Sequence, residues 1–79
     1  MLIGKPIDDI KKAIGINDRF LFQRELFSNN AGLMDQTIDE INRLSSFTDA
    51  QRFIQSNFDW DYNVATTETF MNLVRRRFK

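Results

Sequence analysis

The chain has 79 residues, of which 42% are hydrophobic and 28% are charged, with eleven basic and eleven acidic side chains. A net charge of zero argues against a non-specific binder of nucleic acid or of anionic membranes, because such proteins need a surplus of Lys and Arg. The chain contains no Cys and no His, which excludes disulfides, cysteine-based metal sites and the usual general base.

Two short helices are predicted at the start of the chain. Pro6 suits a first helical position, isoleucines then recur at spacings of three and four as far as Ile14, and Gly15 ends this first helix. Asn17 is the predicted N-cap of a second helix, over residues 18–27. Apolar residues cover more than half of this second helix, so we expect it to be central and in contact on several sides.

Three more helices are predicted in the remainder. An apolar stripe over residues 31–45 indicates the third helix, and turn residues precede it. Thr48 and the glutamine three residues later predict a capping box for a fourth helix, which fades near Asn57. Residues 59–63 lack a stripe and are expected to form a loop whose aromatic side chains fold back on the core. The last helix is predicted over residues 64–78.

The fold class follows from these elements. No strand-like alternation, internal repeat or low-complexity stretch occurs, so we predict an all-α fold, a compact bundle of about five short helices. Residues 1–79 are expected to form a single domain, either a free protein or a piece excised from a longer chain. No segment approaches the roughly 18 apolar residues of a membrane span. The lack of cysteine favours the cytoplasm, although nothing in the chain specifies a compartment.

A resemblance to a known family rests on one run of residues and covers about 7–60. The run is IGINDRFLF at residues 14–22, followed by ELF at residues 25–27. It resembles a small all-helical bacterial domain of unknown function, which usually stands at the end of a longer uncharacterised protein. The resemblance implies a recurring module without an established activity. Folding alone also explains the run, with a glycine stop, an asparagine cap and apolar core residues.

One pattern imitates a metal site. Asp59, Asp61 and Asn63 occupy the spacing of the first three ligands of a calcium-binding EF-hand loop. The later positions fail, because Val64 stands where glycine is required and Phe70 where a glutamate is required. We therefore expect these acids to cap the last helix, and no metal or other cofactor.

Catalytic groups are scarce. Neighbouring carboxylates such as Asp8 and Asp9 diverge by about 100° on a helix, and no histidine is present to activate a Ser or Thr. We expect neither an enzyme nor a small-molecule substrate. For Arg19 we expect an ion pair with Asp18, Asp59 or Asp61 rather than a role in recognition.

The leading functional hypothesis rests on an excess of aromatic residues for so small a chain. A bundle buries one face of each helix, so apolar residues beyond that face can point outward to a partner. The excess therefore favours a protein-interaction module, with a second copy of the chain among the expected partners. The predicted contact residues are Phe22, Phe27, Trp60, Tyr62, Phe70 and Phe78.

The alternative hypothesis comes from the charge run at the chain end. Arg75, Arg76, Arg77 and Lys79 are expected to form a cationic tip, which could bind the phosphates of a nucleic acid. Nucleic acid is the less favoured partner, because no second basic patch occurs and the run also complements the dipole of the last helix.

Overall fold

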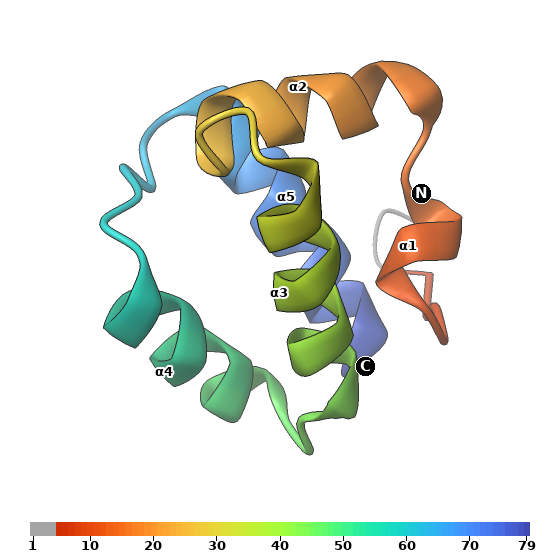
Figure 1. The fold of residues 1–79 in the computed structure, drawn as a ribbon. Helices are drawn as coiled ribbons and strands as arrows, with labels where there is room; N and C mark the ends of the chain where they lie inside the picture. The colour runs from red at the N-terminus through yellow and green to blue at the C-terminus, as the bar shows by residue number, and fades with distance from the viewer. Residues whose placement is uncertain (1–4) are drawn as a thin grey trace.

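The structure, a computed structural model, describes residues 5–79 and has five α-helices and no strand in that range (Figure 1). The predicted all-α bundle of five short helices is therefore confirmed. The first four residues of the predicted domain lie outside the described range. The helices are α1 (Ile10–Ala13), α2 (Ile16–Leu26), α3 (Ala31–Arg43), α4 (Phe47–Asn57) and α5 (Ala65–Arg77). None of these helices is long and apolar enough to cross a membrane.

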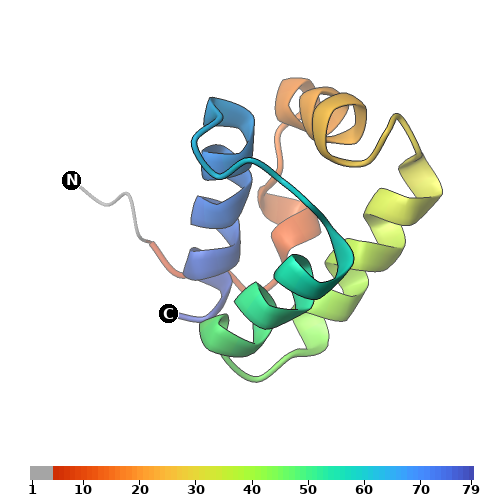
Figure 2. The same cartoon turned by 90° about the vertical axis from the view of Figure 1, so that its left-hand side faces the viewer.

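The central helix is α5, not α2 as predicted. It contacts α1, α2 and α4, and it contributes Phe70, Leu73 and Val74 to the core. In Figure 1, α2 crosses one end of the molecule, and in Figure 2 the long connection from α4 to α5 arches across the side of the bundle. The apolar residues of α2 are spread around the helix, so that contact with α5 buries only one side of it. Phe20 is on the other side and is 67% exposed.

The first two helices begin at other residues than predicted. The chain around Pro6 is not helical, because the Ile7 amide donates a hydrogen bond to the Arg76 carbonyl at the end of α5 (3.2 Å). Helix α1 begins after Asp9, whose side chain accepts a hydrogen bond from the Lys11 amide (2.9 Å). Helix α2 has Gly15 at its N-cap, and the Gly15 carbonyl already accepts the first helical bond, so Asn17 lies inside the helix.

The caps of the later helices come from neighbouring turn residues. In α4 the Ser46 hydroxyl accepts a hydrogen bond from the Asp49 amide (3.1 Å), which leaves Thr48 in the first turn rather than at the predicted cap. The Asn30 side chain caps α3 by accepting from the Leu33 amide (3.0 Å). The predicted fading of α4 near Asn57 is confirmed.

Aromatic rings fill one half of the core. Phe70 lies edge-on to Phe22 (ring centroids 5.3 Å apart), to Phe27 (5.9 Å) and to Trp60 (5.4 Å), while Phe58 stacks on Trp60 (4.7 Å). The Trp60 indole N–H also donates a hydrogen bond to the Leu26 carbonyl at the end of α2 (2.9 Å). Of the two loop aromatics predicted to fold back on the core, Trp60 does so, whereas Tyr62 is 41% exposed.

The other half of the bundle is joined by Asn42 of α3. Its side-chain oxygen accepts a hydrogen bond from the Ile10 amide (3.2 Å), and its side-chain nitrogen donates one to the Asp9 carboxylate (3.0 Å). The Asn42 carbonyl accepts a hydrogen bond from the Arg77 guanidinium (2.7 Å). One residue thus connects the start of α1 and the end of α5 to α3.

We expect Asn42→Ala to destabilise the domain by about 1–3 kcal/mol, because it leaves the Ile10 amide without its acceptor and removes one of the two hydrogen bonds to the Asp9 carboxylate. Urea unfolding followed by circular dichroism measures this loss. The control is Asn57→Ala, which removes only an exposed local bond to the Phe53 carbonyl and should change stability by less than about 0.5 kcal/mol. Equal effects of the two variants would show that Asn42 does not join the helices.

Candidate functional site

Three of the six predicted contact residues belong to the core. Phe22, Phe27 and Phe70 are almost completely buried, so no surface contact of this fold includes them. The physical reason is size, since a 79-residue chain needs its largest rings to build a core at all. Trp60 and Phe78 are partly buried and pack against that core. Tyr62, at 41% exposure, is the predicted contact residue with the most accessible side chain among these six.

The strongest surface exposure of apolar side chains was not predicted. Ile16 is 75% exposed and Phe20 is 67% exposed, one turn apart on α2. Their spacing of four residues is visible in the sequence. It does not single out this pair, because the other apolar residues of α2 point in several further directions. Two side chains make a small patch, and single exposed apolar residues are normal on protein surfaces.

The predicted cationic tip is divided among three segments of the chain. The Arg75 guanidinium lies over the Phe47 ring of α4 (4.8 Å to the centroid). The Arg76 guanidinium donates a hydrogen bond to the Lys5 carbonyl (2.7 Å), and that of Arg77 donates to α3 as described above. These bonds hold the chain ends against the bundle, so the arrangement gives the nucleic-acid hypothesis no support. Lys79, the fourth predicted residue, is exposed.

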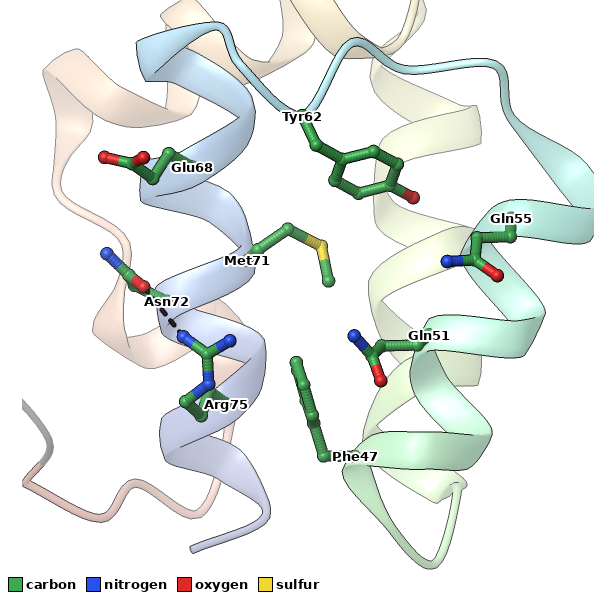
Figure 3. Close-up of a pocket in the computed structure, with 8 residues that line it drawn as sticks. All are labelled: Phe47, Gln51, Gln55, Tyr62, Glu68, Met71, Asn72 and Arg75. Atoms are coloured by element: carbon green, nitrogen blue, oxygen red, sulfur yellow. Dashed lines mark hydrogen bonds between the residues drawn. The ribbon is translucent and has the colours of Figure 1, made fainter.

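A hollow of about 470 Å³ lies between α4 and α5. We call it the α4–α5 groove. Figure 3 shows Met71 of α5 pointing into it, with Gln51 and Gln55 facing it from α4. The groove is lined by Phe47, Gln51, Gln55, Tyr62, Glu68, Met71, Asn72 and Arg75. It combines apolar contact surface with amide groups, and it contains predicted residues from both hypotheses.

Opposite charges mark the α5 edge of this groove. Glu68 and Arg75 are both exposed, and Asn72 lies between them and accepts a hydrogen bond from the Arg75 guanidinium (3.2 Å). Burial raises the pKa of the Tyr62 hydroxyl, so this group stays protonated at neutral pH and can donate a hydrogen bond. The groove therefore offers donors, acceptors and both signs of charge around a methionine.

The groove has no signal that sequence reasoning could have used. Its α4 side consists of Phe47 and of two glutamines one turn apart, and glutamines are common on solvated helix faces. A second, smaller groove of about 360 Å³ lies between α3 and α4. Its lining residues are Leu33, Gln36, Thr37, Glu40, Phe53, Asn57 and Phe58.

The acidic residues act locally. The prediction that Asp59 and Asp61 cap the last helix is wrong, because the N-cap of α5 is Val64 and no side chain caps it. The Asp61 side chain instead accepts a hydrogen bond from the Asn63 amide (2.9 Å), which forms the turn before α5. Within residues 5–79, no three His, Cys, Asp or Glu side chains are placed to hold a metal ion.

Arg19 forms an ion pair within the chain, but its partner is Asp35 of α3 (3.0 Å) rather than any of the three predicted acids. This pair joins α2 to α3.

Comparison with known proteins gives one family. A family model described as "Domain of unknown function (DUF8457)" matches residues 11–79, which include all five helices except the first residue of α1. No curated protein and no solved structure shows significant similarity to the chain.

Proposed function

We propose that this chain, which belongs to the DUF8457 family of domains of unknown function, is a non-catalytic protein-interaction module whose contact is the α4–α5 groove. The observation that carries the proposal is the composition of that groove. Its apolar surface comes from Phe47, Met71 and the Tyr62 ring, and polar side chains surround it. Such a mixture of a small apolar centre and a polar rim is typical of protein contacts.

The polar groups of the groove suit a peptide chain. The side-chain amides of Gln51 and Gln55 each offer an acceptor and two donors, and they make no side-chain hydrogen bond within residues 5–79. Peptide groups offer the complementary donors and acceptors. Met71 is 8% exposed, so only the edge of its side chain reaches the groove, and most of the apolar contact surface comes from Phe47 and the Tyr62 ring.

The same groove lacks the groups needed for catalysis. Glu68 is the only carboxylate among its lining residues, and burial raises the pKa of the Tyr62 hydroxyl, so the groove has no second group that could serve as a general base. We therefore propose binding without chemistry.

From the resemblance of residues 14–27, we further propose that the domain is bacterial and stands at the end of a longer chain, where it would join that chain to a partner.

Selection from a random displayed-peptide library tests the proposal. We expect enriched peptides that bind the wild-type domain and lose about tenfold or more in affinity for Gln55→Arg, which narrows the groove and adds a charge. The matched control is Gln36→Arg, the same change on an exposed residue of the other groove, and it should bind like wild type.

Two results would contradict the proposal. One is enrichment of peptides whose affinity is unchanged by Gln55→Arg, because such peptides bind outside the α4–α5 groove. Peptides whose affinity is reduced by Gln36→Arg would contradict the proposal most clearly. The other is a domain that enriches no peptide and also stays monomeric at all concentrations.

A further inference from the structure

We infer that the α4–α5 groove is occupied by a second copy of this chain, held by an antiparallel contact between the α5 helices of the two copies. The inference rests on the proposed function and names its partner. It follows from the order of the charges of Glu68 and Arg75 along α5 and from the symmetry of homodimers. It also follows from the lack of an ion-pair partner for either residue within the range 5–79.

The charges along the exposed edge of α5 are arranged symmetrically with opposite sign. Glu68 and Arg75 are seven residues apart, which is two helical turns or about 10.5 Å along the axis, and they therefore lie on nearly the same face. The midpoint between them falls between Met71 and Asn72. Figure 3 shows this order along α5, with Glu68 nearer the start of the helix, its carboxylate on the side away from α4, and Arg75 nearer the end.

Neither Glu68 nor Arg75 forms an ion pair with another residue of the range 5–79. The ion pairs among residues 5–79 use Lys11, Arg19, Arg24 and Arg43 with acids on α2 and α3, and none of them includes Glu68 or Arg75. Arg75 is nevertheless held in place, by the Phe47 ring and by Asn72. A cation that is already ordered loses little conformational freedom when a carboxylate binds it.

A two-fold axis turns this arrangement into two ion pairs. Most soluble oligomers are symmetric, and a two-fold contact brings residue i of one copy to residue j of the other and the reverse. An axis through the midpoint of α5 lays the two helices antiparallel. Glu68 then faces the partner's Arg75, and Arg75 faces the partner's Glu68. A second copy thus presents the complementary charge at both ends of the groove.

The residues at the centre of α5 suit the position of such an axis. Asn72 is exposed at this point, and its amide can pair with the same amide of a second copy because an amide carries both donor and acceptor; Met71 beside it is only 8% exposed and belongs to the core. The glutamines of α4 lie beside this contact and are within reach of the partner helix. The contact would be small and polar at its edges, so exchange of its charges should control it.

Charge exchange tests the inference by light scattering and sedimentation equilibrium over a range of protein concentrations. We expect Glu68→Arg and Arg75→Glu each to weaken the dimer about tenfold or more, because each replaces two attractive pairs with two repulsive ones. The double variant restores both pairs in reverse and should dimerise like wild type. An equimolar mixture of the two single variants should form a heterodimer.

Matched controls keep folding separate from association. Circular dichroism verifies that each variant is folded, and Glu40→Arg makes the same change on α3, outside the groove, where it should leave the dimer intact. A wild type that is monomeric at about millimolar concentration would overturn the inference, and so would single variants that dimerise normally. If such a monomer still binds library peptides in the groove, the proposed function stands and only the identity of the partner is wrong.

Discussion

Phe70→Ala is expected to destabilise the domain by about 3–5 kcal/mol, the usual cost of truncating a buried aromatic residue. Phe70 is fully buried and its ring contacts Phe22, Phe27 and Trp60, so the cavity would open at the centre of the aromatic half of the core. Small domains have a free energy of unfolding of about 5–15 kcal/mol, of which this loss is a large part. Urea unfolding followed by far-ultraviolet circular dichroism measures it.

The matched control is Phe20→Ala, the same truncation on the exposed side of α2. We expect it to change the free energy of unfolding by less than about 0.5 kcal/mol, because the ring is already largely in water. Comparable losses of stability at the two positions would contradict the structure, in which Phe70 is buried and Phe20 is exposed. If Phe70→Ala stayed as stable as wild type, the aromatic residues would be free for a partner, as the excess of aromatic residues predicts.

Periodic patterns predicted helices well where one face alone is apolar. In α3 the stripe of Met34, Ile38 and Ile41 is completely buried, as its spacing of three and four residues predicts. In α2 the run Phe20-Leu21-Phe22 points in three directions, and only the position of α5 decides that Phe22 is inside and Phe20 outside. The pattern therefore predicts the helix but not which side of it is covered.

Helix starts depend on hydrogen bonds that the local sequence does not contain. Pro6 and its neighbours would suit a helix, but the Ile7 amide donates a hydrogen bond to the Arg76 carbonyl at the end of α5, 69 residues away in the chain. Where two capping residues are close together, as with Ser46 and Thr48, their propensities are too similar to decide, and the turn geometry selects one.

The candidate site was least accessible to prediction from sequence. The three consecutive arginines predict a single cationic tip, whereas their guanidinium groups reach three different segments because each position on the helix faces another neighbour. The α4–α5 groove is formed by polar and apolar residues of two helices and of the loop between them, and the sequence does not specify how these segments pack. Tyr62 and Arg75 were predicted as contact residues, but for opposing hypotheses, and only the fold brings them to one groove.

The loop before α5 is expected to depend on Trp60 for its position. Trp60→Ala should destabilise the domain by roughly 3 kcal/mol, because it removes the ring that stacks on Phe58 and lies edge-on to Phe27 and Phe70. It also leaves the Leu26 carbonyl at the end of α2 without its indole donor. Urea unfolding followed by circular dichroism is the measurement, since the variant lacks the only tryptophan of the chain.

A second variant separates the hydrogen bond from the packing. Trp60→Phe keeps an aromatic ring but removes the indole N–H, so its expected cost is about 1–2 kcal/mol, the value of one hydrogen bond plus a small packing loss. Tyr62→Phe is the control in the same loop and should be nearly neutral, because the Tyr62 hydroxyl makes no hydrogen bond within residues 5–79. A neutral Trp60→Phe beside a costly Trp60→Ala would assign the whole effect to ring packing. If both Trp60 variants were neutral, the loop would be held by other contacts, and Tyr62 would not be fixed at the end of the α4–α5 groove.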